Sequence, residues 1–463
     1  MLKNIIKKSP KIVNKTICNI YYNIPDYIKY GRKFRKQYNF LEESQYWSKE
    51  KLEKYQLNEL KKLIKHAYET VPYYKKLFDK NNIRYEQINS FEDLKKIPYL
   101  TKDIIKENLE ELISNKYNKN DIKYVTTGGS TGVPMGFYID DRSDFLREWS
   151  FIANIWNRVG YNPKKNNRMV ILRGNFIENG FYEYKDNKLI LSSFKIEKHI
   201  EKYIELIRDY NPDFIQAYPS SIIILARYIN LKKINLKLNN LKAIICSSEN
   251  IYSQQRNEIE DAFNTRVFSF YGHTEHSCIA GECEQNTFYH LNSEYGYTEL
   301  LDEQGKEIIE DGNLGELVVT GFGNYVMPFI RYKTGDMAIL SKEKCDCGRN
   351  YKMIKKIQGR KQDYFINKNG EKIIFTWADY PLWSIKDKIW AYQYVQNEPG
   401  KVFLYIHFKE EVKPFEFKNI FDEVEKIFNK YYDDFEIEIR LNNEIKSTSR
   451  GKFKYLIQNI NLN

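Results

Sequence analysis

The sequence contains few cysteines and no long apolar run. Its six cysteines are spread over 463 residues, which excludes the disulfide framework of small secreted domains. An uninterrupted apolar run of about 18 residues, the length that spans a bilayer, does not occur. No continuous apolar core follows the basic N-terminal residues, so a secretory signal is not expected. These features predict a cytoplasmic protein with reduced thiols.

Acidic residues are outnumbered by basic ones, 62 to 73, which gives a net charge of +11. The length predicts more than one domain, and the 42% of apolar residues can build a large core. The basic excess fits either a solvated surface or attraction to phosphate-bearing ligands, acidic polymers or membranes. No nucleic-acid-binding motif is present and the charges are mixed, so nucleic acid is not an expected partner.

Residues 1–37 form the most basic segment, with ten Lys and Arg against a single acidic residue, Asp26. Apolar residues such as Ile5, Ile6 and Ile12 lie between the charges. One interpretation is peripheral contact with the inner, anionic face of a membrane. The other is that the segment packs on its own domain.

The first third of the chain predicts helices. Ser48–Tyr74 carries apolar residues close to a 3.6-residue period, and Val71-Pro72 is expected to end that helix. Ser90, with Asp93 three residues later, predicts a capped helix start, and Thr101–Asn108 starts another helix in the same way.

After residue 120, short β-branched runs alternate with helical segments, which predicts an α/β core with mostly parallel sheets. The runs are Arg168–Leu172, Phe214–Tyr218, Leu241–Cys246 and Arg266–Tyr271. Tyr297–Leu301 and Gly315–Thr320 predict antiparallel strands. Asp363–Ile366 and Lys372–Phe375 predict a hairpin across Asn369-Gly370.

The last hundred residues predict a small α+β unit, with strands at Lys401–Phe408 and Phe435–Leu441 and a helix at Pro414–Tyr431. A boundary near residues 358–363 divides the chain into a large N-terminal domain, 1–358, and a small C-terminal domain, 359–463. The expected fold is therefore a large α/β domain followed by a small α+β domain.

The segment YVTTGGSTGVPMGFY, Tyr124–Tyr138, is rich in glycine and hydroxyl residues. Gly128, Gly129 and Gly132 let the backbone approach a ligand closely, and exposed amides in such a turn bind anions. The segment therefore predicts a phosphate-binding loop. A glycine-rich surface loop without a ligand is the alternative.

Four further motifs follow in the sequence, and each alone is a weak signal; for the first of them an ordinary turn is the alternative. FYGHTE, Phe270–Glu275, can stack a base and offers a carboxylate of the kind that Mg²⁺ prefers. Pro328–Asp336, after Gly315–Thr320, ends in an Asp that can accept two ribose hydroxyls. The last two are Gly359–Asp363 and Ser447–Lys454.

The five motifs occur in the order found in the adenylate-forming superfamily, which the sequence resembles. That superfamily includes acyl-CoA synthetases and the adenylation domains of peptide synthetases. The sequence looks most similar to the phenylacetate–CoA ligase family, in its capsular-polysaccharide, CapK-like branch. His66–Tyr74 and Phe91–Pro98 also resemble that branch, so the resemblance covers nearly the whole chain.

The resemblance implies that the loop binds the β- and γ-phosphates of ATP. The residues implied for it are Thr127, Gly128, Gly129, Ser130, Thr131 and Gly132. Met135 stands where the family often has a lysine. The loop is therefore expected to act through amides and hydroxyls, with positive charge supplied from elsewhere.

The remaining nucleotide contacts are also implied by the resemblance. Tyr271, followed by Gly272, would flank the adenine, and Ser248 with Glu249 would form the other wall. Asp336 would bind the ribose hydroxyls.

The reacting groups follow in the same way. The resemblance implies that Thr274 contacts the α-phosphate, that Glu275 binds Mg²⁺ and that Arg360 reaches the ribose or phosphate. Lys452 matches the mobile catalytic lysine, which offsets the repulsion between the attacking carboxylate and the α-phosphate. Lys454 is the alternative, and the Gly-Lys match favours Lys452. Gln362 stands at the usual hinge position, where Asp or Lys is more usual.

Three cysteines and a histidine predict a metal site. These candidate ligands are Cys283, His290, Cys345 and Cys347. Three thiolates and one imidazole suit a closed, structural Zn²⁺ site, and similar segments bind zinc in some members of the family. Such a site would join the ends of the segment 283–347. His276 and Cys278 are alternative ligands, Cys246 is expected in the core, and four unrelated reduced residues are the alternative to any site.

The sequence thus predicts an ATP-dependent carboxylate ligase that makes an acyl-adenylate and pyrophosphate. The acyl group would pass to CoA, or to an amine or hydroxyl of a sugar or amino acid, in surface-polysaccharide biosynthesis. An adenylyltransferase and a basic membrane- or polymer-binding protein on an inactive ligase fold are the alternatives. Aromatic residues that can line the acid pocket, or pack in the core, are Trp149, Phe151, Trp156, Phe176 and Tyr218.

Overall fold

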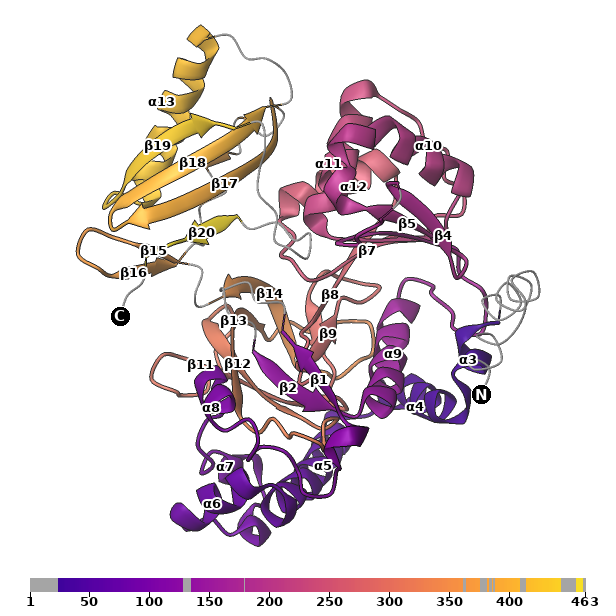
Figure 1. Ribbon diagram of the computed structural model, residues 1–463, viewed down its shortest axis with the longest axis vertical. Coiled ribbons are helices and arrows are strands. Elements are labelled where there is room, and N and C mark those ends of the chain that lie inside the picture. The colour runs from indigo at the N-terminus through magenta and orange to yellow at the C-terminus, as the bar shows by residue number, and fades with distance from the viewer. Residues whose placement is uncertain are drawn as a thin grey trace.

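The computed structural model describes residues 24–460 apart from 128–134, 179, 361–363, 375–380, 383–384, 386–387, 409–413 and 443–454. Helices fill the N-terminal third, a large mixed sheet occupies the middle, and a separate sheet lies at the C-terminal end (Figure 1). The predicted α/β class with a small C-terminal α+β part is confirmed.

The helices are short to medium in length, and none within the described ranges is long and apolar enough to cross a bilayer. The α-helices are α3 (Asp26–Lys29), α4 (Gly31–Ser44), α5 (Lys49–Thr70), α6 (Pro72–Lys80), α7 (Phe91–Leu94), α8 (Lys102–Glu107), α9 (Asp141–Asn157), α10 (Ile200–Tyr210), α11 (Pro219–Lys232), α12 (Ser253–Phe263) and α13 (Pro414–Tyr431). The 3-10 helices are η1 (Tyr85–Gln87), η2 (Lys119–Asp121), η3 (Ser193–Lys195) and η4 (Glu197–His199).

The strands form the large sheet, two small hairpins and the C-terminal sheet. Those of the large body are β1 (Lys123–Thr126), β2 (Gly136–Ile139), β3 (Met169–Arg173), β4 (Tyr182–Lys185), β5 (Lys188–Ser192), β6 (Phe214–Ala217), β7 (Ala243–Cys246), β8 (Val267–Gly272), β9 (Ile279–Gly281), β10 (Tyr289–Leu291), β11 (Gly296–Leu301), β12 (Leu314–Gly321), β13 (Tyr332–Ser341) and β14 (Met353–Arg360). Those that follow are β15 (Tyr364–Ile366), β16 (Lys372–Ile374), β17 (Ile389–Glu398), β18 (Lys401–Phe408), β19 (Glu436–Leu441) and β20 (Leu456–Gln458).

The twelve strands of the large sheet follow the order β11-β12-β13-β14-β10-β9-β8-β7-β6-β3-β5-β4. The run from β5 to β8 is parallel, as predicted, and the strands from β9 to β11 are antiparallel. The sheet therefore changes character at β8, the strand that leads into the Tyr-Gly-His-Thr-Glu turn.

Helices cover both faces of the parallel strands, which is why those strands are mostly apolar. On β7, Ile244 and Cys246 pack toward α10, α11 and α12, whereas Ala243 and Ile245 pack toward α4 and α9. Cys246 is thus in the core, as expected. The period of two residues along a strand produces this division.

The N-terminal helices α5 and α6 pack on the antiparallel strands. Ser48 and Ser90 cap α5 and α7, and Asp93 completes a capping box with Ser90. α5 ends at Thr70 with Val71 as its C-cap, so Val71-Pro72 ends this helix as predicted, and Pro72 begins α6. Proline is suited to the first turn of a helix, where its missing N–H costs nothing.

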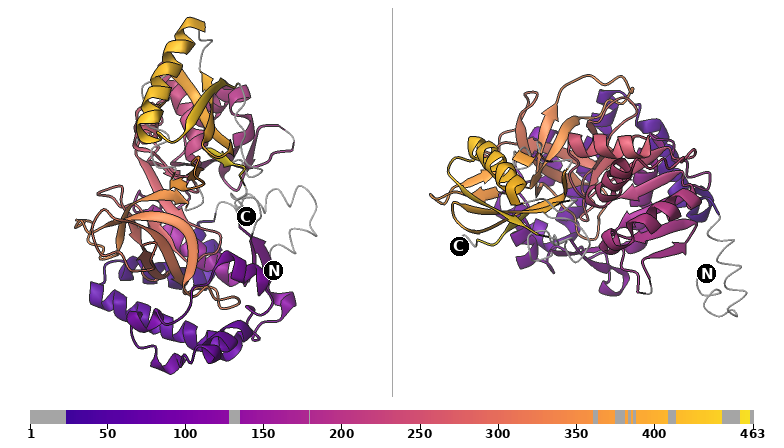
Figure 2. Two further views of the ribbon diagram at one scale, coloured as in Figure 1. Left: turned by 90° about the vertical axis from the view of Figure 1, so that its left-hand side faces the viewer. Right: turned by 90° about the horizontal axis from the view of Figure 1, so that it is seen from above.

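The C-terminal sheet has the order β19-β18-β17-β20 and packs its core against α13. It lies at the opposite end of the molecule from the N-terminal helices (Figure 2, left). Arg227 of α11 donates to the carbonyl of Trp390 over 2.6 Å, and Gln255 of α12 donates to the Tyr455 hydroxyl over 2.7 Å. The two parts of the molecule therefore meet at α11 and α12.

Candidate active site and metal site

The base of the candidate phosphate loop is a short hairpin. β1 pairs antiparallel with β2, and the Thr127 amide donates to the Met135 carbonyl over 2.8 Å. The Met135 amide in turn donates to the Thr127 hydroxyl over 3.0 Å. Thr127 is therefore held in place at the start of the loop. The other predicted loop residues lie outside the described residues: Gly128, Gly129, Ser130, Thr131 and Gly132.

Tyr271 and Asp336, which were predicted to bind the adenine and the ribose, contact each other. The Tyr271 hydroxyl donates to Oδ2 of Asp336 over 2.7 Å. Burial, followed by the charge of Asp336, raises the pKa of Tyr271 well above its ordinary value, so the phenol stays a donor. The Asp336 amide donates to the Thr334 hydroxyl, which fixes the turn that carries the carboxylate.

Glu275 is a buried and ionised carboxylate. Tyr332 donates to its Oε1 over 2.9 Å, and Nδ1 of His273 lies 3.2 Å from its Oε2. Burial alone would raise the pKa of Glu275, but His273 and the hydrogen bonds lower it to about 2. Each carboxylate oxygen has two lone pairs, so Glu275 fits a Mg²⁺ ligand that is already oriented. Thr274 precedes Glu275 in the same turn and is half-buried.

Ser248 and Glu249 follow β7, at the same edge of the sheet as Tyr271 and Gly272. Ser248 has a left-handed backbone, with φ of +72°, and receives a hydrogen bond from Arg173 over 3.4 Å. Glu249 accepts from the amide and the hydroxyl of Ser220, both at 3.0 Å, at the start of α11. The Glu249 carboxylate is therefore engaged with α11.

Of the other predicted site residues, the structure describes only the backbone of Arg360. The backbone of Arg360 is paired with that of Asp336 across β13 and β14, which brings the two motifs side by side. Lys452 and Lys454, like the hinge position Gln362, lie outside the described residues. β20 starts four residues after Lys452 and pairs in parallel with β17.

The aromatic residues considered for the acid pocket mostly pack in the core. Phe151, Trp156 and Tyr218 are buried, and Trp149 packs against that core while its indole N–H donates to Asp26. Phe176 is 80% exposed.

Sequence reasoning missed three residues that hold the site. Tyr332 and His273 orient Glu275, and Arg173 lies over the Tyr218 ring beside Ser248. Tyr332 and His273 belong to the motifs themselves. Their roles needed the three-dimensional contacts, because residue spacing along a chain does not fix distances across strands.

The sheet brings the four candidate metal ligands together. β10 lies between β9 and β14, so His290 is opposite Gly281 on one side and Met353 on the other. Cys283 follows β9, and Cys345 and Cys347 precede β14. All four ligand atoms lie within 4.8 Å of one another.

The distances in the cluster fit a tetrahedral zinc site. Sγ of Cys283 is 3.5 Å from Sγ of Cys345, and Sγ of Cys347 is 3.8 Å from Nε2 of His290. Zn–S bonds of about 2.3 Å imply ligand–ligand separations of about 3.8 Å. Contacts with Cys283 and His290 lower the pKa of Cys347, which favours a thiolate.

The alternative ligands are used elsewhere. Nδ1 of His276 lies 2.7 Å from Oδ2 of Asp144, and the Cys278 thiol receives a hydrogen bond from Thr298. Both residues lie outside the group of possible metal ligands found among the described residues.

An ion pair joins the two ligand-bearing segments. Arg349 donates to both carboxylate oxygens of Glu284, at 2.7 and 2.9 Å. Its Nε also donates to Gln45 at the end of α4, so the N-terminal helices are attached to the metal-site region.

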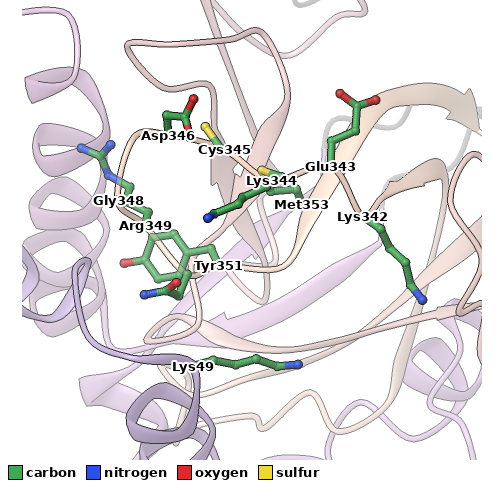
Figure 3. A pocket seen from close by; sticks show the side chains of 11 residues that line it. Lys49, Lys342, Glu343, Lys344, Cys345, Asp346, Gly348, Arg349, Tyr351 and Met353 are labelled. Carbon is green, nitrogen blue, oxygen red and sulfur yellow. The ribbon is translucent and has the colours of Figure 1, made fainter.

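Cys345 borders an open cavity of about 600 Å³ on the side of Lys49 and Lys342 (Figure 3), which gives solvent molecules access to the cluster.

Comparison with known proteins agrees with this geometry. The profile of the CapK C-terminal domain matches residues 365–459. The protein CapK of Staphylococcus aureus is 26% identical over 407 residues, which cover 84% of this chain and 85% of CapK. The phenylacetate-coenzyme A ligase of Thermus thermophilus is 25% identical over 358 residues, covering 76% of this chain and 80% of that enzyme.

Over most of its length the chain is thus similar to adenylate-forming ligases. The crystal structure of 2-hydroxyisobutyryl-CoA ligase in the postadenylation state has the same fold, with a TM-score of 0.71 and 19% identity over 90% of this chain and 93% of that one. These similarities confirm the predicted family and the enzyme class of AMP-forming ligases.

Proposed function

We propose that this adenylate-forming ligase activates a carboxylic acid with ATP and then transfers the acyl group. The carboxylate would attack the α-phosphorus, releasing pyrophosphate and leaving an acyl-adenylate. The observation that carries the proposal is the contact between Tyr271 and Asp336, with the ionised Glu275 beside them. These residues form one half of a nucleotide site at the end of β8, next to the strands that bear the phosphate loop.

Each remaining site residue takes the role that the resemblance implies. Thr127–Gly132 would hold the phosphates, Ser248, Glu249 and Gly272 would border the adenine, and Thr274 would contact the α-phosphate. Mg²⁺ bound at Glu275 would neutralise phosphate charge. Arg360 and Lys452 would complete the site as the cations that offset the charge of the transition state.

We propose two domains, 1–358 and 359–463, with Lys452 on the smaller one. Their separate hydrophobic cores support this division. β14 ends at Arg360 and β15 begins at Tyr364, so the connection between the domains is short. Met135 brings no positive charge to the phosphate loop, so a lysine on the smaller domain would supply that charge.

The acyl acceptor is either CoA or an amine or hydroxyl of a sugar or amino acid. The similarity to phenylacetate-coenzyme A ligases supports CoA, whereas a precursor of surface polysaccharide is what the sequence resemblance to the capsular-polysaccharide branch implies. A cytoplasmic protein that contacts the membrane through residues 1–37 would suit such a precursor. Flotation with anionic vesicles, with and without that segment, tests the membrane contact.

Product analysis tests the reaction. The full-length enzyme, ATP, Mg²⁺ and a panel of acids, with and without CoA, should release AMP and pyrophosphate and yield an acylated acceptor. AMP attached to the final product would instead indicate an adenylyltransferase. Nucleotide binding without any turnover across the panel would contradict the ligase proposal.

We also propose that Cys283, His290, Cys345 and Cys347 hold one structural Zn²⁺. The donor set, the burial of Cys283 and His290 and the separations of the ligand atoms support this. When bound, zinc would join the segment after the Tyr-Gly-His-Thr-Glu turn to the segment after β13. Both segments lead into the nucleotide site.

A further inference from the structure

Tyr455, in the C-terminal part of the chain, is held by a side chain of the large body. Gln255 on α12 donates from Nε2 to the Tyr455 hydroxyl over 2.7 Å. The rings of Tyr252 and Tyr455 also meet edge to face, with centroids 5.8 Å apart and planes at 82°. The contact thus combines a hydrogen bond with aromatic packing, so it defines both the distance and the orientation of Tyr455.

The amide group of Gln255 is oriented by its own helix. Its Oε1 accepts from the backbone amide of Tyr252 over 3.3 Å, in the capping box at the start of α12. With the oxygen held in this way, Nε2 is the end that faces Tyr455. Gln255 is only 8% exposed, and a buried donor that loses its partner costs free energy. The side chain is therefore a fixed donor.

Tyr455 is also fixed to the C-terminal sheet. The Tyr394 amide donates to its carbonyl over 2.8 Å, directly before the parallel pairing of β20 with β17. Its ring lies 5.2 Å from that of Tyr392 on β17. Figure 1 shows β20 on the side of the C-terminal sheet that is nearest to the large body. A shift of Tyr455 relative to α12 is thus a shift of β17 and β20 as well.

Both partners of this hydrogen bond are close in sequence to residues of the proposed nucleotide site. Lys452 precedes Tyr455 by three residues, which limits the separation of their Cα atoms to about 11 Å. On the other side, α12 begins four residues after Glu249, which is proposed to border the adenine. The bond therefore connects the segment of the proposed catalytic lysine to the helix that follows the proposed adenine wall.

A second contact joins the same helices to β17. Arg227 on α11 donates to Glu258 on α12 over 2.7 Å, and to the carbonyls of Ile389 and Trp390 over 3.1 and 2.6 Å. Ile389 and Trp390 begin β17, the strand that pairs with β20. Two separate contacts restrict rotation as well as translation, so α11 and α12 together fix the orientation of the C-terminal sheet.

We propose that Gln255 is a positioning residue for Lys452: through Tyr455, it sets where the lysine lies relative to the α-phosphate and the attacking carboxylate. This inference rests on the proposed ligase function. A misplacement of about 1 Å at a reacting group can lower a rate by about 100-fold. Losing the Gln255–Tyr455 bond lowers the fraction of molecules in which Lys452 is in place, and leaves the ATP contacts of the large domain intact.

Variants of the full-length enzyme that change single polar groups test the contact. Tyr455→Phe keeps the ring and should lower the maximal rate of pyrophosphate–ATP exchange about tenfold, with the KM for ATP changed less than about twofold. Gln255→Met lacks the donor and should have the same effect. Gln255→Glu should keep most of the rate, because its carboxylate still caps α12 and accepts from the Tyr455 hydroxyl.

A background without the lysine separates positioning from general stability. Residues that act as one unit have non-additive effects. Adding Tyr455→Phe to Lys452→Ala should therefore lower the residual exchange no further. The matched control is Tyr405→Phe on β18, because the Tyr405 hydroxyl lies 3.5 Å from Arg440 on the neighbouring strand of the same sheet. This control should leave the exchange rate unchanged.

The outcomes distinguish this inference from the proposed function. Wild-type exchange that is unchanged in Tyr455→Phe and Gln255→Met would refute the inference and leave the ligase function standing. An equal loss from Tyr455→Phe with and without Lys452 would refute it too, since Tyr455 would then contribute stability alone. If Tyr455→Phe does not fold, equal rates in Gln255→Met and Gln255→Glu would contradict the inference. A wild type without exchange for any acid would refute the function and the inference together.

Discussion

The Tyr271 hydroxyl donates a hydrogen bond to the Asp336 carboxylate over 2.7 Å, although 65 residues separate the two in sequence. Tyr271 is the penultimate residue of β8, the last parallel strand of the large sheet, and Asp336 lies on the antiparallel strand β13. The contact therefore joins the parallel and antiparallel parts of the sheet at the point where the nucleotide is proposed to bind. Adenine and ribose recognition would be coupled through this pair.

Replacing Asp336 should weaken nucleotide binding more than replacing Tyr271. Asp336→Asn removes the charged acceptor for the ribose hydroxyls, and hydrogen bonds to charged groups contribute about 1.5–3 kcal/mol. We expect a loss in AMP affinity of about tenfold or more by calorimetry. Tyr271→Phe keeps the ring and should cost less than about fivefold. Equal affinities for wild type and Asp336→Asn would exclude the proposed ribose contact.

The pair of Asp144 and His276 should make stability depend on pH. Burial alone would lower the pKa of His276, but Glu148 and Asp144 raise it to about 9, above the usual value of 6.5. This stabilisation is fully present below pH 6.5 and is lost as the pH rises through 9. It amounts to at most about 3 kcal/mol.

His276→Asn tests this dependence by urea unfolding at a series of pH values. Asn tolerates the left-handed backbone of this position, where φ is +50°. The difference in unfolding free energy between wild type and variant should shrink between about pH 6.5 and pH 9. A difference that does not change with pH would show that the pair carries no charge.

Removing a metal ligand should release the zinc. Cys347→Ser should reduce zinc content from one ion per chain, measured by mass spectrometry on protein purified without chelator, and lower the melting temperature. Because Cys345 borders an open cavity, strong chelators should have the same effect on the wild type. Cys278→Ala is the matched control, since Cys278 is buried outside the cluster, and it should retain the metal.

A buried ion pair holds the segment that leads to Asp336. Arg331 donates to both oxygens of Glu299 at 3.0 and 2.8 Å, and both side chains are almost completely buried. Glu299→Ala leaves the guanidinium uncompensated and should lower the unfolding free energy by about 3–5 kcal/mol.

The control for this prediction is an exposed pair. Glu92→Ala breaks the contact between Glu92 and Lys95 near the surface and should change the unfolding free energy by less than about 1 kcal/mol. Similar losses in both variants, measured by urea unfolding, would contradict the importance of the Arg331 pair for the segment.

Much of the fold follows from the sequence because several local signals agree with the final structure. The Ser90 capping box, the hairpin at Asn369-Gly370 and the apolar runs of the parallel strands are all found where predicted. β4 was missed because its four residues are all exposed, so no apolar alternation marks it. β17 was missed because it is buried in an irregular pattern along its length.

The sequence predicts which motifs form the candidate site, but not how their residues are arranged in space. The separation between Cys283 and Cys345 along the chain gives no distance, and only the position of β10 between β9 and β14 brings them to 3.5 Å.

The direct test of acyl-adenylate formation is the exchange of pyrophosphate into ATP, measured for wild type, Lys452→Ala and Lys454→Ala with a panel of acids. We expect that at least one acid supports exchange and that Lys452→Ala lowers the exchange rate by about 100-fold or more, with ATP affinity nearly unchanged. Lys454→Ala should keep most of the activity. No exchange with any acid would contradict the ligase proposal, and equal losses in the two variants would contradict the catalytic role of Lys452.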